Sequence, residues 1–332
     1  MTPTDRLLTT QYLALAQECL AHGETASGRE LAQHAFTRSC TNEALQGQSL
    51  LVLAQLDVLD SQLVRALRLG RMASTAFRSL GDTTNEALAL TTFSYAASAL
   101  KHDELALAAT ERSISLVDHA DEGLVQANGL NYLGLAQMWA GKSDQAIRTF
   151  EASVWYAEDT DRPETSFQPL VNSCVALVFR HHQAVYVQRE SGAETLSGMH
   201  SLTQQAQRLW SQGAAVPLNR GTTGSGLQAL LEFSMSYAFA QSGDFERSEM
   251  HALACRRASS TWAETTWLRA LFWWARFELA NQLGDLHQAQ QLAWAMHSAA
   301  AAGQQRHLET IAARLTRYIE ARIAASRVVT LK

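Results

Sequence analysis

The stretch at residues 132–150, YLGLAQMWAGKSDQAIRTF, carries the pattern that decides the fold. It has the spacing of two short amphipathic helices joined at Gly141. Gly134 lies before the turn, and Ala146 and Phe150 follow it at helical spacing. No group of residues in the stretch suits catalysis, so the pattern indicates packing between helices.

The rest of the chain has the composition of a helical protein. It has 332 residues, of which 47% are hydrophobic and 18% charged, enough to bury a core. Ala, Leu, Gln, Glu and Arg, all good helix formers, dominate residues 4–162, which contain no proline. Period-two alternation of β-branched residues is absent. The sequence therefore predicts an all-α protein.

A small residue follows each turn of the pattern, and it recurs along the chain. A small side chain lets two helix axes approach to about 8–10 Å. The spacings between these small-residue positions are 38, 40, 40, 102 and 41 residues. The recurring period favours a helical solenoid over an ordinary antiparallel bundle. The positions are Gly28, Ala66, Ala106, Ala146, Ser248 and Ala289.

The pattern resembles that of the tetratricopeptide repeat family, W-x2-L-G-x2-Y…A-x3-F…P. The copy at 131–153 keeps Leu133, Gly134, Ala146 and Phe150. It departs at Leu130 for the Trp, Gln137 for the Tyr and Glu158 for the Pro. The period near 40 is similar to the divergent repeats of bacterial regulators and kinesin light chains. The resemblance implies a right-handed α-solenoid of antiparallel helix pairs with a C-terminal capping helix.

The repeat pattern also predicts how the chain is organised within a single solenoid over residues 1–332. The spacing of 102 is explained by an enlarged repeat, in which Ala206 takes the small-residue position. The expected parts are four repeats in 5–162, an enlarged repeat with a protruding helical hairpin in 163–212, a flexible loop in 213–226, two further repeats in 227–303, and a capping helix in 304–328.

Charge and composition exclude several classes of function. The net charge is -5 and no basic stripe is present, so no nucleic-acid partner is expected. The most apolar stretch, 268–280, contains Arg269, Arg276 and Glu278, which argues against a membrane span. The four cysteines form no CxxC motif, and the N-terminus lacks the profile of a secretory signal. These features predict a cytoplasmic protein.

Three motifs suggest chemistry, but each fits a simpler interpretation. His181 and His182 point about 100° apart on a helix, so we expect exposed histidines at the hairpin tip rather than metal ligands. His251 and Cys255 share a helix face without two further ligands, which favours packing. The sequence GTTGSG at 221–226 lacks the GK[ST] of a phosphate-binding loop. We expect no cofactor, no metal and no enzymatic activity, although a site assembled from distant residues stays open.

Tryptophans are dense in one part of the chain. Such residues fill cores between helices and also serve as anchors at interfaces. Trp274 is expected to be the exposed member, because it falls at a groove-facing position. The residues are Trp262, Trp267, Trp273 and Trp274.

The family resemblance implies that the first helix of each repeat lines a concave binding groove. The matching positions lack the Lys/Asn/Arg set with which co-chaperone members hold a peptide carboxylate. A segment with a few apolar anchors fits them better. The expected groove residues are Gln55, Thr91, Tyr95, Asn131, Leu135, Val171, Val175, Phe233, Tyr237, Trp274 and Glu278.

Two functions follow from this interpretation. The first is a non-catalytic scaffold or adaptor that binds a protein or peptide segment in the groove. The second is a sensory or regulatory module of a bacterial signalling system, which binds a peptide or small ligand and controls a fused or partner output domain. Neither requires a cofactor, and both are compatible with a homo-oligomer.

Overall fold

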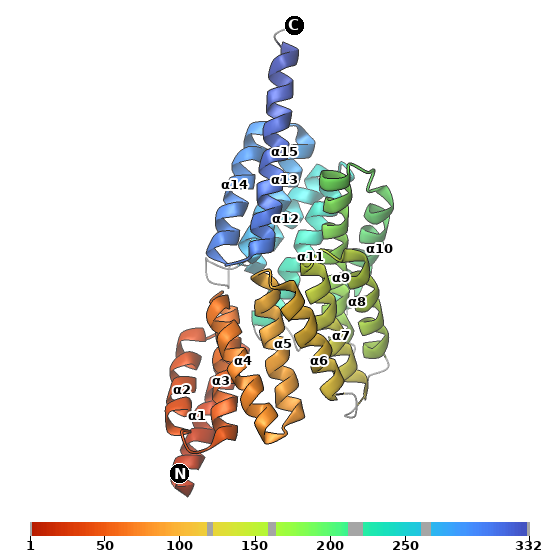
Figure 1. Cartoon of the computed structure of the whole chain (residues 1–332). Coiled ribbons are helices and arrows are strands. Elements are labelled where there is room, and N and C mark those ends of the chain that lie inside the picture. Colours follow the sequence, from red (N-terminus) through yellow and green to blue (C-terminus); the bar gives the residue numbers. More distant parts are fainter. Residues whose placement is uncertain (1, 118–121, 159–163, 212–221, 260–266, 331–332) are drawn as a thin grey trace. The chain divides into compact units, whose positions relative to one another are not determined.

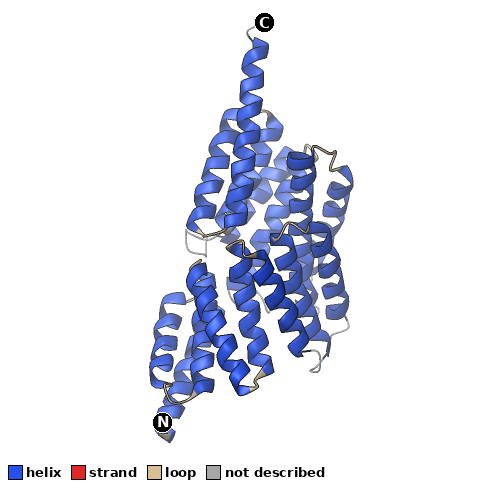
Figure 2. Cartoon of the chain, viewed as in Figure 1, coloured by secondary structure: helices blue, strands red, loops and turns tan. Residues whose placement is uncertain are grey.

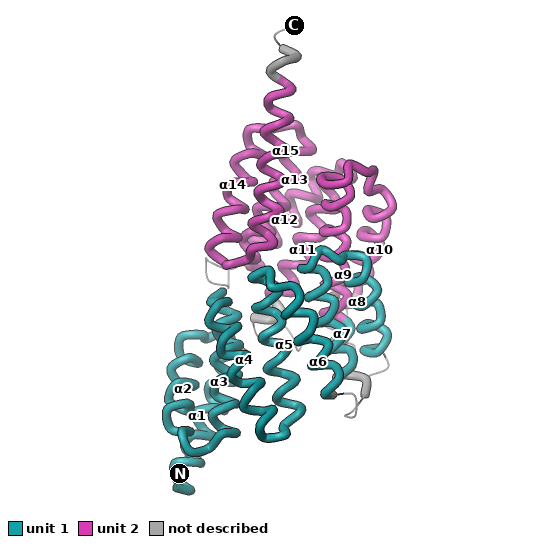
Figure 3. Tube along the Cα trace, in the orientation of Figure 1, with its two compact units in different colours: residues 1–166, 218–223 teal, residues 167–217, 224–332 magenta. Residues whose placement is uncertain are grey.

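The computed structural model describes residues 2–117, 122–158, 164–211, 222–259 and 267–330. Within these ranges the secondary structure is helical throughout and contains no strand (Figure 2). The prediction of an all-α protein is confirmed. The chain divides into two compact units, which are described separately (Figure 3). Unit 1 comprises 1–166 with 218–223, and unit 2 comprises 167–217 with 224–332.

Unit 1 consists of helix pairs in chain order (Figure 1). The two helices of each pair pack against each other, and each first helix also contacts the first helix of the next pair. This is the packing expected of repeats. The pairs are α1 (Pro3–His22) with α2 (Thr25–Arg38), α3 (Glu43–Leu59) with α4 (Leu63–Leu80), α5 (Thr83–Ala99) with α6 (Asp103–Val117), and α7 (Glu122–Trp139) with α8 (Ser143–Glu158).

Unit 2 continues the pattern of helix pairs with one irregular element. Its first long helix passes into a π-helix, η1, and its last helix packs on α14 and contacts η1. The elements are α9 (Glu164–His182), η1 (Gln183–Gln188), α10 (Ala193–Ser211), α11 (Thr222–Gln241), α12 (Phe245–Ser259), α13 (Leu268–Leu283), α14 (Leu286–Ala302) and α15 (Arg306–Thr330).

The turns between paired helices are located where the sequence predicts them. Gly141, between α7 and α8, has φ +76°, and Gly284, between α13 and α14, has φ +79°. Glycine adopts this left-handed conformation without steric penalty. At the second turn Asp285 caps α14, and its side chain accepts a hydrogen bond of 2.9 Å from the backbone N–H of Gln288.

The small-residue positions are all buried. This is the environment expected where two helix backbones approach closely. Ala206, which the sequence assigns to the same position in the enlarged repeat, is also fully buried. The buried positions are Gly28, Ala66, Ala106, Ala146, Ser248 and Ala289.

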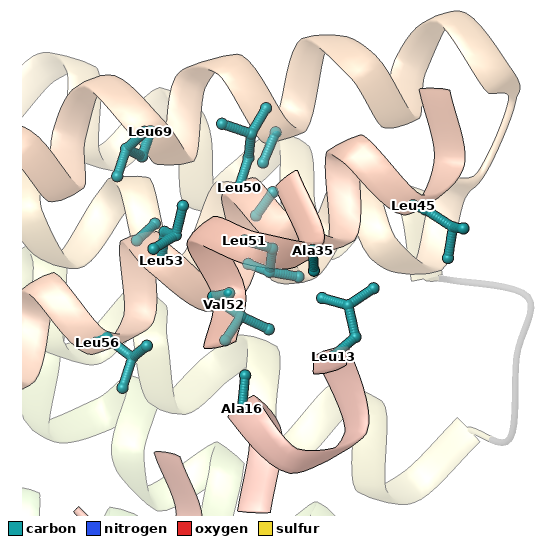
Figure 4. Packing of buried hydrophobic residues seen from close by; sticks show 14 of the residues in the cluster. Leu13, Ala16, Ala35, Leu45, Leu50, Leu51, Val52, Leu53, Leu56 and Leu69 are labelled. Carbon is teal, nitrogen blue, oxygen red and sulfur yellow. The ribbon is translucent and has the colours of Figure 1, made fainter. Parts of the chain in front are cut away.

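The core of the first two helix pairs is built around α3 (Figure 4). Six consecutive residues of this helix are buried, from Ser49 to Ala54. Because successive residues point about 100° apart, such a run means that α3 is covered on all sides. Leu13 of α1, Ala35 of α2 and Leu69 of α4 belong to the same cluster.

Buried carboxylates also connect neighbouring helices of unit 1. The side chain of Asp57 on α3 is fully buried and accepts hydrogen bonds from Arg29 Nη2 on α2 at 2.8 Å and from Arg65 Nε on α4 at 2.6 Å. Glu86 on α5 is likewise buried and accepts from Arg78 Nε on α4 at 2.9 Å. A buried charge is tolerated when it is paired in this way.

The close approach of α7 and α8 gives a first testable prediction. A Cβ at Gly134 would lie 2.5 Å from Cε1 of the fully buried Phe150. At a contact this short we expect the overpacking in Gly134→Ala to lower the free energy of unfolding by about 2–3 kcal/mol. This loss exceeds the gain in helix propensity, which is about 1 kcal/mol. Urea denaturation followed by circular dichroism measures the change.

A matched control for this prediction is Gly198→Ala in α10. There the closest atom to a new Cβ is Leu177 Cδ1, at 3.9 Å. This variant is expected to gain up to about 1 kcal/mol, because alanine favours the helix and meets no clash. Equal effects at the two glycines would contradict the tight packing of α7 on α8.

Some expectations about organisation differ from the structure or lie outside it. The expected flexible loop at 213–226 is helical from Thr222 onward, where α11 begins, while 213–221 falls outside the described residues. The division into repeats, hairpin and cap stays a prediction. None of the helices in the described ranges combines the length and apolar character that crossing a bilayer requires.

Candidate functional site

In unit 1, three of the five expected groove residues occupy equivalent positions on successive first helices. Gln55 lies on α3, Tyr95 on α5 and Leu135 on α7, at intervals of 40 residues. In the same order, α3 contacts α5 and α5 contacts α7. All three side chains are half-buried and therefore accessible. These three residues are called the unit 1 row.

The other two groove residues of unit 1 differ from each other in exposure. Thr91 on α5 is half-buried, and its hydroxyl donates to the backbone oxygen of Leu88 at 2.8 Å. Asn131 on α7 is buried. Thr91 is thus accessible beside the unit 1 row, whereas Asn131 belongs to the interior.

In unit 2, all the expected groove residues are buried. They are Val171, Val175, Phe233, Tyr237, Trp274 and Glu278. The expectation that Trp274 is exposed is wrong, because its side chain has 0% exposure. The reason is that other rings surround it: Phe179, Phe233 and Tyr237 lie with their centroids 5.4 to 5.9 Å from its own.

Glu278 is the charged residue of this interior. Its carboxylate accepts hydrogen bonds from Tyr186 Oη at 2.5 Å, Gln241 Nε2 at 2.8 Å and Trp274 Nε1 at 3.0 Å. Burial raises the pKa of Glu278 from 4.5 to about 7, and the three hydrogen bonds limit the rise. A buried carboxyl group therefore titrates near neutral pH inside unit 2.

The histidine pair at the end of α9 is also interior. The expectation of exposed histidines is wrong, because the side chains of His181 and His182 are 3% and 2% exposed. His181 Nδ1 lies 3.1 Å from Tyr237 Oη, and burial lowers the His181 pKa to about 4. Neither ring nitrogen of His182 has a hydrogen-bond partner among the residues that the structure describes. Burial, with Arg314 and His181, lowers its pKa to about 3.

Tyr186 links this interior to the surface of unit 2. It belongs to η1, and its hydroxyl donates to Glu278 and accepts from Asn281 Nδ2 at 3.1 Å. The side-chain carbonyl oxygen of Asn281 in turn accepts from Arg322 Nη1 of α15 at 2.5 Å. A continuous chain of hydrogen bonds therefore runs from the buried carboxylate to an arginine on α15.

A surface pocket of about 600 Å³ lies between η1 and α15. Arg189, Arg314, Arg317 and Arg322 line it, together with Tyr186 and Tyr318. We call it the arginine pocket. Its volume is within the range typical of small-molecule sites.

The remaining motifs have structural roles in the described residues. His251 Nδ1 lies 2.7 Å from Glu232 Oε2, and its ring stacks on Phe239, while Cys255 is buried. Trp267 and Trp273 are half-buried, whereas Trp262 and residue 221 lie outside the described ranges. Across the part of the chain that is described, no group of three or more His, Cys, Asp or Glu residues could hold a metal ion.

Sequence reasoning missed Tyr186 and the arginine pocket. The available signal was the spacing of Arg314, Arg317 and Arg322, which falls on one face of a helix. These arginines form a pocket only because another element, η1, faces this side of α15. Tyr186 and Arg189 reach α15 through a π-helical turn, and no periodic sequence pattern predicts such a turn.

Comparison with known proteins supports the fold and nothing finer. No protein-family model and no curated protein matches the chain. A solved structure of a Rap protein complexed with Competence and Sporulation Factor is similar, with 8% identity over 96% of this chain and 99% of that chain and a TM-score of 0.52. The fold is a helical-repeat fold of the tetratricopeptide type.

Two further solved structures are similar at lower scores. Aspartyl phosphate phosphatase F from Bacillus subtilis is 11% identical over 88% of this chain and 74% of its own, with a TM-score of 0.49. A putative kinesin light chain from Podosopora anserina with TPR-like repeats is 17% identical over 63% of this chain and 99% of its own, with a TM-score of 0.47.

Proposed function

We propose that the chain is a non-catalytic scaffold that binds a protein or peptide segment across the first helices of unit 1. The observation that carries the proposal is the unit 1 row, where Gln55, Tyr95 and Leu135 occupy equivalent, accessible positions on neighbouring helices. An amide, a phenol and an aliphatic side chain in line offer hydrogen bonds and apolar anchors to a segment that crosses the helices.

The similarity in fold supports this proposal in a limited way. The Rap structure is a complex with Competence and Sporulation Factor, so a repeat array of comparable length accommodates a binding partner in that protein. The six expected groove residues of unit 2 are buried, so the proposed contacts are restricted to unit 1.

A peptide-library selection tests the scaffold function. Peptides selected on the intact chain should bind Tyr95→Ala/Leu135→Ala at least about tenfold more weakly, because each lost anchor typically costs about 1 kcal/mol or more. Circular dichroism melting checks that the variant is folded, since Tyr95 also packs against Leu63 and Leu100.

The matched control is Val64→Ala/Leu105→Ala, which removes exposed apolar side chains from the second helices α4 and α6. It should bind the selected peptides with wild-type affinity. Equal affinity for all three chains, or a selection that yields no binding peptide, would contradict the proposal.

The second candidate function, a regulatory module that binds a small ligand, is favoured by one observation. The arginine pocket of unit 2 has the size of a small-molecule site and an excess of positive charge.

A further inference from the structure

The arginine pocket is formed by one stripe of α15 facing the π-helical turn. Arg314, Arg317, Ala321 and Arg322 follow one another at helical spacing along α15 and all line the pocket. The small side chain of Ala321 leaves room between the arginines. On the other side of the pocket, η1 contributes Tyr186, and the residue after the end of η1 is Arg189.

The side chains that line the pocket carry an excess of positive charge. Among the described residues, four arginines and no acidic residue line it. Within the described ranges, none of the four guanidinium groups has a carboxylate oxygen within 4.0 Å, whereas Arg247 and Arg276 of the same unit are paired with Asp244 and Glu249. Like charges gathered in one place repel, and an anion bound among them relieves that repulsion.

The aromatic wall of the pocket is held in place by buried groups. The ring of Tyr186 meets that of Tyr318 edge to face at 4.8 Å, and the guanidinium carbon of Arg322 lies 5.8 Å from the Tyr318 ring centroid. The hydroxyl of Tyr186 is hydrogen-bonded to Glu278, and the guanidinium of Arg322 is hydrogen-bonded to Asn281. The wall is therefore ordered before any ligand binds, which reduces the entropy lost on binding.

Two local irregularities lie at this pocket or next to a residue that lines it. Arg189 has φ +61°, a left-handed conformation that residues other than glycine seldom adopt. His182, whose ring centroid lies 5.0 Å from that of Tyr186, is buried with both ring nitrogens unpartnered. Strained backbone, π-helical turns and unpaired buried polar groups concentrate at functional sites.

We propose that the arginine pocket binds a small metabolite carrying two or more phosphate groups. Arginine forms paired hydrogen bonds with phosphate oxygens, and four guanidinium groups suit several such groups better than a single carboxylate. Tyr186 and Tyr318 offer an aromatic surface to the rest of the molecule. Its volume of about 600 Å³ is in the range of sites that bind small metabolites.

Isothermal titration calorimetry with inorganic pyrophosphate as the probe tests this proposal on the full chain. Pyrophosphate should bind the wild-type chain more tightly than sulfate does at the same ionic strength. Arg314→Gln/Arg317→Gln should weaken pyrophosphate binding at least about tenfold. Both arginines are exposed, so the variant should keep its fold, which circular dichroism checks.

The matched control is Arg256→Gln/Arg257→Gln on α12, which removes the same charge from unit 2 at exposed positions away from the pocket. It should bind pyrophosphate as the wild type does. The proposal is overturned if the control weakens binding as much as the pocket variant, or if sulfate binds as tightly as pyrophosphate. Tighter binding of citrate than of pyrophosphate would overturn the assignment to phosphate. None of these results bears on the unit 1 row, which the peptide selection tests by itself.

Discussion

Glu278→Gln is expected to abolish a loss of stability that unit 2 undergoes between pH 5 and pH 8. In the wild-type chain burial raises the pKa of Glu278 from 4.5 to about 7. Between these values the folded state keeps a proton that the unfolded state has released. The stabilisation is therefore fully present below pH 4.5 and is lost as the pH rises through about 7. For this shift the loss between pH 5 and 8 is about 2.5 kcal/mol.

The buried histidines act in the opposite direction and do not obscure the result. Burial lowers the pKa of His181 to about 4 and that of His182 to about 3, from 6.5. Their contribution to stability is present above pH 6.5 and is lost as the pH falls toward 4 and 3. Both histidines remain in the variant, so the difference between the wild-type and variant curves isolates Glu278.

Urea denaturation at several pH values measures this effect, with pulsed hydrogen exchange on peptides from α11 and α13 to follow unit 2 alone. The introduced glutamine would present an amide NH₂ to one of the three donors, so the variant is expected to be less stable at pH 5 by about 1 kcal/mol. The test is therefore how steeply the free energy of unfolding changes with pH. Glu320→Gln, at an exposed position on α15, should leave that slope unchanged. Parallel curves for Glu278→Gln and the wild type would contradict the assignment.

Trp274→Ala is expected to destabilise unit 2 by about 3–5 kcal/mol. The side chain is fully buried, and three aromatic rings pack around it, so its removal leaves a large cavity. It also removes the indole N–H that donates to Glu278. The same pulsed-exchange denaturation experiment gives the change in the free energy of unfolding.

Two companion variants separate the causes of this loss. Trp274→Phe keeps a ring but removes the N–H donor, and it should cost about 1–3 kcal/mol. Trp294→Ala removes an indole that is 51% exposed on α14, and it should cost less than about 1 kcal/mol. If Trp274→Ala were as mild as Trp294→Ala, the packing of these rings in unit 2 would be refuted.

The repeat pattern was predictable because it depends on local sterics. A turn that needs a left-handed residue selects glycine, as at Gly141, and a close approach of two helices selects a small residue, as at Gly134 against Phe150. These constraints act within a few residues of each other or across one helix pair. Their spacing is therefore visible in the sequence and gave the correct fold class.

The interior of unit 2 was not predictable in the same way. Periodicity places Val175 on the expected groove-facing side of α9 and Trp274 on that of α13. It does not say which residues cover those sides. The covering includes His182 and Tyr186, and it depends on a π-helical turn that departs from the 3.6-residue period. The three residues of the unit 1 row keep part of their surface accessible, and their role in binding stays a prediction.

The hydrogen bonds around Glu278 also bear on how similar repeats find their correct neighbours during folding. Helix pairs built on one pattern have nearly interchangeable apolar surfaces, so apolar contacts alone discriminate weakly between the right and the wrong partner. The carboxylate on α13 is satisfied by donors from η1 and α11 as well as from its own helix. A misdocked α13 would bury a polar group without those donors, which costs about 1–3 kcal/mol or more for a charged group. The buried carboxyl group of Glu278 therefore favours the arrangement in which α13 packs against η1 and α11 over arrangements that lack these donors.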